Sequence, residues 1–446
     1  MRKNKKGTST LFLAIILSAL ILVETTYIAY VADLDRRLTY TRALKEQAEI
    51  YLASYNRQLF KTYGIYAFDH STINPYVFNQ ILAANGYEDG DTIYASGIYS
   101  IDTDALRRAV ACYYSYRGSG VIFQRFASQI MALIEQIDEG GVIAELRGFV
   151  TSPASGLLGR IIAGGADISE AISGALELLG LDESSPEVQM FLYLMSSLGA
   201  LNHESPDFGN DFNPSDFGFI FDFLELNSSF YDLGTDINEN VLIHICLADY
   251  AANNFDCMLE DDTAIDGTGF NCFHQNNESD SEYILTGLEG FPARALTDYY
   301  IFGTLFIKNL AYDLSDPQTR EIVVPVADVL STVISVLSAG TVILPPEVYE
   351  LIIVIIMAEI ESVQELMTVL NGGEITFLSI GDTDVLTLDY RGFLTVFMNL
   401  VPDDTLLTRM LDILNRDFTD YCIGINVETD YAGSTLNYEA VYELYQ

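Results

Sequence analysis

Cysteine and histidine side chains are the residues of this chain whose types and spacing could support catalysis. The 446 residues include five cysteines and four histidines. His244 and Cys246 lie two positions apart, as do Cys272 and His274, and a cysteine nucleophile needs a histidine base within hydrogen-bond reach. That spacing puts two side chains on one face of a strand but not of a helix. The chain has no nucleophile-elbow, zinc-protease, P-loop or dinucleotide-binding motif. We therefore interpret the residues of both pairs as ordinary core or loop residues, and we expect the protein not to be an enzyme.

Three of the cysteines form a local group that could be oxidised. Cys246, Cys257 and Cys272 are close enough in sequence for one disulfide if this part of the chain lies outside the cell. The odd total then leaves at least one thiol or an intermolecular bond. Buried, inert thiols are an equally good interpretation. No CxxC pair occurs, which argues against a zinc ribbon or a thioredoxin-like site.

Two oxygen-rich segments raise the question of a calcium site. Residues 262–267 end in Gly267, as the turn of an EF-hand loop requires, but Phe273 stands where the bidentate glutamate belongs. A second segment offers four oxygen-bearing side chains, Asp207, Asn210, Asp211 and Asn213. We expect both to be solvated loops, and we expect no cofactor.

The charge of the chain limits its partners. It carries 22 basic and 63 acidic residues, a net charge of −41. Four basic residues lie within the first six positions, and the only lysine after Lys61 is Lys308. So acidic a surface repels phosphate backbones, so we expect no nucleic-acid partner. A solvated, soluble surface is the simplest consequence of this charge.

An apolar segment follows the basic leader at residues 1–7. Residues 8–32 hold a single charge, Glu24. At about 1.5 Å per residue, a helix of this length crosses a hydrocarbon core of ~30 Å with some tilt. Tyr30 is too bulky for the small-x-small site of a cleaved signal peptide. We therefore predict a transmembrane helix embedded in the lipid bilayer, with a cytoplasmic N-terminus and everything from Asp33 onward outside the cell.

Glu24 is the residue of this span with two opposed interpretations. A carboxylate inside a bilayer is costly and is normally functional or partnered. It would then mark an intramembrane contact with another protein. Alternatively, Glu24 lies near the outer interface, beside Thr25, Thr26 and Tyr27, and reaches water.

An amphipathic stalk helix is predicted over residues 33–64, directly continuing the span. Gly64 is a good stop signal for it. Its apolar positions recur every three or four residues and so form one face; they are Tyr40, Leu44, Ala48, Tyr51, Tyr55, Leu59 and Tyr63.

The remaining chain divides by composition into four segments. We predict a mixed α/β segment at 65–139, a helical insertion rich in small residues at 140–202, an acidic polar middle region at 203–281, and a helical core with closing strands at 282–446. The fold class is α+β: a mainly helical extracytoplasmic domain with a small β-sheet. Helices are expected at 105–116, 121–139, 187–201, 294–313, 321–339, 347–370 and 405–418, strands at 65–68, 92–99, 375–378, 385–390 and 421–431, and one or the other at 241–251.

Two of the later helices are apolar enough to suggest a membrane hairpin. Residues 329–344 and 351–358 are joined through Pro345 and Pro346. Each apolar run is shorter than the roughly 20 residues that a span needs. Core helices of the outer domain are therefore favoured.

Several sequence blocks, in order, resemble a known family. KGTSTLFLA at 6–14, followed by the apolar run, resembles the start of TadE/TadG-like proteins of the tight-adherence (Flp) pilus system. More specifically, the chain resembles an uncharacterised family of single-span envelope proteins from Firmicutes. The blocks that carry this likeness are YNRQLFKTYGIY at 55–66, EYILTG at 282–287, NLAYDLSDP at 309–317, AEIESV at 358–363 and TRMLD at 408–412.

The resemblance implies a minor pilin-like or assembly component. Its partners would be other pilus or envelope membrane proteins, met through the N-terminal helix, and Gly7–Thr8 would be a processing site. Phe12 occupies the place where such pilins usually carry a glutamate, which weakens the case for polymerisation. The alternative is a surface adhesin or ligand-binding sensor domain on a single-span anchor.

Overall fold

The computed structural model describes residues 6–74, 76–86, 93–95, 99–114, 132–133, 137, 142–162, 169–181, 184–204, 241–259, 279–380, 383–418 and 420–442. The chain forms two compact units: Met1–Cys112 together with Leu414–Gln446, and Tyr113–Ile413. The closing strands therefore share a unit with the N-terminal helix. The predicted helix at 121–139 falls almost wholly outside the described residues.

One continuous 48-residue helix, α1 (Lys6–Ala53), joins the predicted span to the predicted stalk. The prediction that this helix runs on to Gly64 is wrong, because the chain breaks at residues 54–56 and restarts as α2 (Arg57–Tyr63). Ser54 turns back onto the carbonyl of Tyr51 through both its amide and its hydroxyl, at 3.0 and 2.7 Å. Asn56 then caps the new helix, since its Oδ1 accepts the amide of Leu59 at 3.1 Å.

Gly64 does end the second helix, as predicted. Its φ of +66° lies in the left-handed region that glycine adopts without strain. Its amide donates to the carbonyl of Phe60 at 2.8 Å.

A five-stranded antiparallel sheet in the first unit is built on β6 (Tyr421–Tyr431), whose bounds match the prediction. Four strands pair with β6: β1 (Phe68–Asp69), β2 (Ile93–Ala95), β3 (Tyr99–Ser100) and β7 (Ser434–Val441). The strand expected at 65–68 starts only at Phe68, and the one expected at 92–99 is two short strands. A 3₁₀ turn, η1 (His70–Thr72), and the helices α3 (Tyr76–Ala84) and α4 (Thr103–Tyr114) complete the unit.

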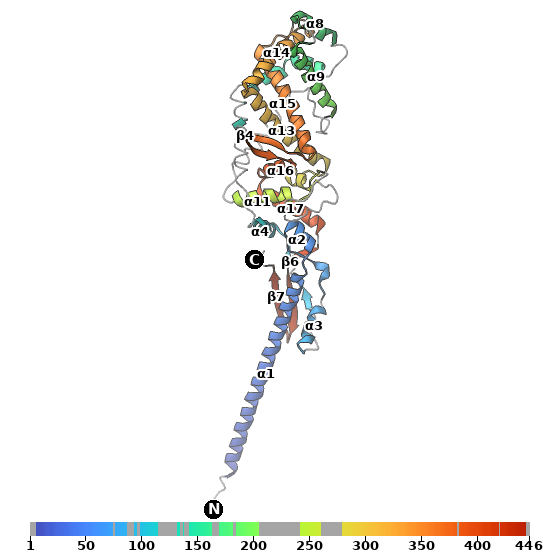
Figure 1. Cartoon of the computed structure of the whole chain (residues 1–446). Helices are drawn as coiled ribbons and strands as arrows, with labels where there is room; N and C mark the ends of the chain where they lie inside the picture. The colour runs from blue at the N-terminus through green and yellow to red at the C-terminus, as the bar shows by residue number, and fades with distance from the viewer. Residues whose placement is uncertain are drawn as a thin grey trace, which may run out of the picture. The chain divides into compact units, whose positions relative to one another are not determined.

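The core of this unit forms where the C-terminal half of α1 meets β6, β7 and α3 (Figure 1). The predicted apolar face is confirmed on α1, where Tyr40, Leu44, Ala48 and Tyr51 are buried. The buried Leu59 and the half-buried Tyr55 and Tyr63 lie within or beyond the break and do not continue that helix face. The side chains opposite this face come from both ends of the chain; they include Phe68, Phe78, Leu82, Ile425, Val427 and Leu436.

Three long helices form the core of the second unit: α13 (Phe291–Ser315), α14 (Pro317–Leu337) and α15 (Pro346–Leu370). All three were predicted, within a few residues. α15 packs against both of the others. Because α14 and α15 bury most of their apolar side chains against protein, the structure favours the core interpretation of residues 329–344 and 351–358 over a membrane hairpin.

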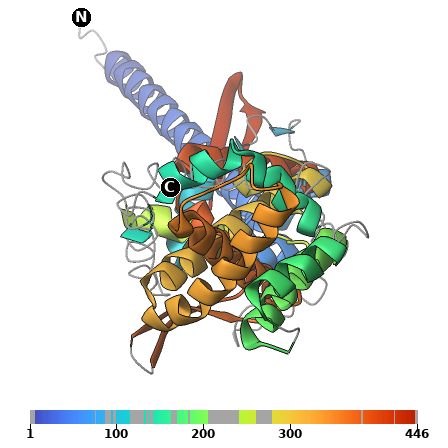
Figure 2. The ribbon, with the colours of Figure 1, turned by 90° about the horizontal axis from the view of Figure 1, so that it is seen from above.

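Helices of the small-residue-rich segment pack onto this core. They are α6 (Val142–Val150), α7 (Pro153–Ile162), α8 (Ser169–Leu179) and α9 (Pro186–Glu204). α8 and α9, green in Figure 2, lie beside α14. Segment 140–202 therefore belongs to the same compact unit as the later helices.

A second group of elements in this unit contains α11 (Val241–Asn253), which resolves the ambiguity at 241–251 in favour of helix. α11 packs against α12 (Asp280–Thr286) and α16 (Tyr390–Met398), and the hairpin of β4 (Ile375–Ile380) and β5 (Thr383–Leu388) packs against α15 and α16; most of α17 (Asp403–Asp417) belongs to the same unit. The strand predicted at 385–390 ends earlier than expected, at Leu388, because the next residue, Asp389, starts a helix. The Oδ1 of Asp389 accepts the amide of Gly392 at 2.7 Å and so starts α16, which the sequence analysis missed.

Candidate functional site

The N-terminal half of α1 presents a long apolar surface with no protein against it. Among the described residues, α1 is the one helix long and apolar enough to cross a membrane, and its most apolar stretch has no buried side chain. Phe12, Leu22 and Tyr27 are 66, 68 and 67% exposed. So large and contiguous an apolar surface marks a site of interaction with lipid or with another apolar surface.

Three hydroxyl groups within this stretch are bonded to the helix itself. Thr25 and Thr26 both donate their hydroxyls to the carbonyl of Leu22, at 3.0 and 2.7 Å. Ser18 donates to the carbonyl of Ala14. A continuous helix satisfies its backbone groups internally, and together with these bonded serine and threonine hydroxyls it meets the main requirement for a segment in a water-free environment.

The sequence-predicted residues of this region all lie on α1. Gly7 and Thr8 belong to its first turns, where the structure describes the backbone only. Glu24 is exposed on the apolar half. Counting about 1.5 Å per residue from Thr8, Glu24 lies ~24 Å along the helix, so both interpretations of this carboxylate stay open.

The C-terminal half of α1 is held by tyrosines from the last hairpin of the chain. The hydroxyl of Tyr431 donates to Oδ1 of Asp33 at 2.7 Å, and its ring lies 5.0 Å from that of Tyr40. The hydrogen bond to the Asp33 carboxylate raises the pKa of Tyr431. The hydroxyl of Tyr442 donates to the carbonyl of Leu52 at 2.7 Å. The helix is therefore fixed to its sheet from Asp33 to Leu52 and projects beyond Asp33.

The two described cysteines of the second unit are buried core residues whose thiols are not activated. Cys246 and Cys257 are both buried, and no disulfide joins them to each other. Burial, above all, raises the pKa of the Cys257 thiol to about 11, although the nearby Arg391 opposes that effect. Burial and Asp249 raise the pKa of Cys246. Because the thiolate is the reactive form, these two thiols are poor nucleophiles. Cys272 and His274 lie outside the described residues.

His244 does not serve as a base for Cys246. Its Nδ1 lies 2.5 Å from Oδ1 of Asp403, and its Nε2 lies 2.7 Å from the carbonyl oxygen of Asn399. Both ring nitrogens are therefore engaged away from the cysteine. The contact between His244 and Asp403 could not be predicted from the sequence. Asp403 is recognisable as a residue at the start of a helix, but nothing in the local pattern indicates that its partner is His244.

Buried carboxyl groups are the feature that the sequence analysis missed. Oε1 of Glu282 accepts the amide of Met258 at 3.0 Å and the hydroxyl of Tyr390 at 2.8 Å, while its Oε2 is buried without a hydrogen bond. Burial raises the pKa of Glu282 and raises that of Asp298 to about 7. Glu359 is fully buried, and neither of its carboxyl oxygens has a hydrogen-bond partner among the residues that the structure describes. The burial of Glu359 could have been predicted from its position inside the apolar run 351–360.

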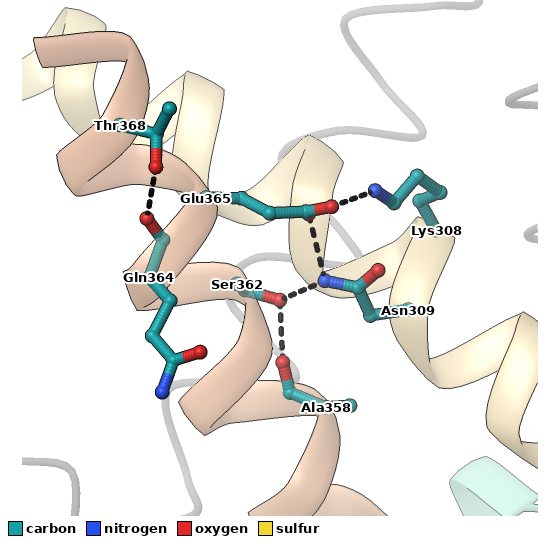
Figure 3. A network of polar contacts seen from close by, with 7 residues as sticks. All are labelled: Lys308, Asn309, Ala358, Ser362, Gln364, Glu365 and Thr368. Atoms are coloured by element: carbon teal, nitrogen blue, oxygen red, sulfur yellow. Dashed lines mark hydrogen bonds and ion pairs between the residues drawn. The ribbon is translucent and has the colours of Figure 1, made fainter. Parts of the chain in front are cut away.

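Lys308, the last lysine of the chain, lies in a polar network between α13 and α15 (Figure 3). Its ammonium is 2.5 Å from Oε1 of Glu365 and 5.9 Å from the centre of the Phe377 ring. The amide of Asn309 donates to Oε2 of Glu365 and to the hydroxyl of Ser362, both at 3.0 Å. Every member has a partner, as a structural network should.

Metal-binding groups are not found in the described part of the chain, where no three histidine, cysteine or carboxylate side chains are placed to hold an ion. Both oxygen-rich segments considered for calcium, 207–213 and 262–267, lie outside that part. Comparison of the chain with protein-family models, with curated proteins and with solved structures gives no match.

Proposed function

We propose that this chain is a membrane-anchored extracytoplasmic structural or assembly protein, a minor pilin-like component of a Tad/Flp-type pilus or a related envelope assembly. The observation that supports it most is the division of α1 into two halves. One half is apolar, exposed and internally satisfied; the other is bonded into the sheet of a compact unit. Such a helix transmits its membrane position directly to a folded domain.

The pilus-specific part of the proposal rests on the resemblance of the leader and of the ordered blocks, and on the place of Gly7 before the apolar run. Partners would be other membrane proteins that meet the apolar half laterally. Packing in a bilayer relies on close contact and on interhelical hydrogen bonds, so Glu24 would be the polar contact of that surface.

Protease treatment of intact, wall-stripped cells tests the topology. The proposal expects degradation from Asp33 onward while the basic leader stays protected. Recovery of a full-length, protected outer part would contradict it.

A surface adhesin or sensor on a simple anchor is the second candidate, and Phe12 favours it because pilins usually carry a glutamate there. N-terminal sequencing of the mature chain separates the two. A chain that begins at Thr8 supports a processed, pilin-like subunit. Retention of Met1 or Arg2 supports the simple anchor.

Substitution of Glu24 tests whether the helix has a protein partner. In crosslinking from α1 in native membranes, Glu24→Leu should abolish lateral crosslinks, whereas Glu24→Gln, which keeps hydrogen bonding, should retain part of them. Unchanged crosslinks in Glu24→Leu would assign Glu24 to the membrane interface instead.

A further inference from the structure

Helices α11 and α16 are joined by two cationic side chains, each of which contacts the C-terminal end of the opposite helix. His244, in the first turn of α11, reaches the carbonyl of Asn399, the residue that caps the end of α16. Arg391, in the first turn of α16, donates to the carbonyl of Ala252 near the end of α11 and, at 3.4 Å, to that of Phe255 just beyond it. The two helices therefore run antiparallel, and each delivers one cation to its neighbour.

These contacts provide hydrogen-bond donors to carbonyl groups at the C-terminal ends of both helices. The last carbonyls of a helix have no intrahelical partner and carry the negative end of its dipole, so a cation placed there is stabilising. Arg391 supplies such a cation permanently, since a guanidinium stays protonated at all ordinary pH values. His244 supplies one only while its ring is protonated.

The surroundings of the His244 ring require the protonated form. Its Nδ1 faces a carboxylate oxygen of Asp403, and its Nε2 faces the backbone carbonyl of Asn399. An ionised carboxylate and a carbonyl only accept hydrogen bonds, so both nitrogens must carry hydrogen. A neutral ring would place one lone pair against an acceptor in a site where the side chain is only 5% exposed.

We propose that His244 is a proton-operated latch, which holds α11 against the turn between α16 and α17 when the ring is charged and releases it when the ring is neutral. This inference rests on the position of the two acceptors, the Asp403 carboxylate and the Asn399 carbonyl, at the two nitrogens of one imidazole ring. It does not depend on the membrane or pilus assignment.

The charged groups around the latch allow this behaviour. From α17, Asp403 faces the ring, and the next residue, Asp404, is exposed. From α16, the charged residue Arg391 lies at the other end of the helix pair, and from α12, Glu282 binds Met258, beyond the far end of α11. On α11 itself, Asp249 lies more than one turn further along. Within the described part of the chain, Asp403 is thus the charge that acts directly on His244.

The direction of the pH effect follows from these contacts. Burial by itself lowers the pKa of His244, but the hydrogen bonds to Asp403 and Asn399 and the charge of Asp403 outweigh it and raise the pKa above its ordinary 6.5. The latch therefore contributes fully below about pH 6.5 and is lost as pH rises through the raised value. Between these two values, the opening equilibrium of α11 should increase by about tenfold per pH unit.

Hydrogen exchange of the full chain in detergent micelles, followed between pH 5 and 9 and corrected for intrinsic rates, tests the latch. The peptides of α11 and of residues 399–405 should lose protection above pH 6.5, whereas α3 of the other unit should not. In His244→Gln the loss of protection of these peptides above pH 6.5 should become clearly smaller than in the parent chain, because the contribution of His244 is removed. His70→Gln, the same change at an exposed histidine of the other unit, should behave as the parent chain does. Equal pH profiles in His244→Gln and the parent would overturn the proposal.

A second measurement observes the protonation of the His244 ring directly. Nitrogen NMR of the four labelled histidines, with His244 assigned by its loss in His244→Gln, should show a ring protonated on both nitrogens at pH 6.5 and titrating above that value. Asp403→Asn should lower the titration midpoint and move α11 opening to lower pH by the same amount. A midpoint at or below 6.5 in the parent, or no change in Asp403→Asn, refutes the latch.

Discussion

At the scale of single residues, Glu359 is the clearest conflict between a side chain and its surroundings. It is fully buried in α15, and its carboxyl oxygens have no hydrogen-bond partner among the described residues. Burial raises its pKa well above the ordinary value, so the folded chain keeps this proton while the unfolded chain loses it above about pH 4.5. Stability then falls as pH rises past that value.

We predict that Glu359→Leu stabilises the second unit at pH 7 by about 1–3 kcal/mol, because an unsatisfied polar group is replaced by an apolar one of similar size. Glu359→Gln is the matched control. It removes the titration but keeps the polar burial, so it should flatten the pH dependence without the full gain. Urea unfolding at pH 5 and 8 measures both effects; destabilisation by Glu359→Leu would mean that the carboxyl has a structural partner.

Lys308 shows the opposite situation, a buried charge with all its contacts made. Lys308→Met should destabilise the second unit by about 1–3 kcal/mol, less than for a fully buried pair because Glu365 is 27% exposed and can be hydrated. Arg320→Met is the control, since Arg320 meets Glu350 at 3.9 Å with its own side chain 78% exposed. That change should cost less than about 1 kcal/mol. Equal losses in urea unfolding would show that the buried network adds nothing.

At the scale of elements, the break between α1 and α2 depends on Asn56. Its Oδ1 caps α2 through the amide of Leu59, and its Nδ2 donates to the hydroxyl of Tyr421 at 2.6 Å. Asn56→Ala should cost about 1–2 kcal/mol and loosen α2 in hydrogen exchange. Asn56→Asp keeps the capping acceptor and loses only the donor, so α2 should stay protected. Loss of protection in both variants would shift the role of Asn56 from the cap to the contact with Tyr421.

The elements also show what sequence patterns can and cannot predict. α1, α13, α15 and β6 carry long periodic or β-branched signals and were predicted. β7 was missed because its connection to β6 is Ala432–Gly433, both with positive φ, and alanine gives no signal for that conformation. Strands as short as β1 and β3 exist only because distant β6 pairs with them.

The candidate site likewise has one part that the sequence predicts and another part that it does not. The apolar half of α1 is fully visible in the sequence, since composition and length determine it. The contacts of His244 with Asp403, and of Glu282 with Tyr390, join residues more than 100 positions apart. No local pattern encodes such contacts, because they depend on which helices pack together.

At the scale of the whole molecule, most of the described carboxyl groups with a shifted pKa have that pKa raised by burial. Burial first of all raises the pKa values of Asp298 and Asp313 to about 7, and those of Glu282 and Glu359 are raised as well. His244 also holds its proton more tightly when folded. The folded chain therefore binds more protons than the unfolded chain over the range from about pH 4 to 8. Asp69 and Asp316 have lowered pKa values that oppose this, but solvent screens the effect at both, since Asp69 is only half-buried and Asp316 is exposed.

Stability should consequently be greater at pH 5 than at pH 8, and the net charge of −41 adds to the effect because its self-repulsion decreases as carboxylates are protonated. Salt separates the two causes, since repulsion between exposed charges is screened over about 3 Å at 1 M salt and buried groups are screened much less. We predict that the urea midpoint still falls between pH 5 and 8 at 1 M salt, and that combining Asp298→Asn with Asp313→Asn reduces the fall. A pH dependence that vanishes at high salt would assign it to the surface charge alone.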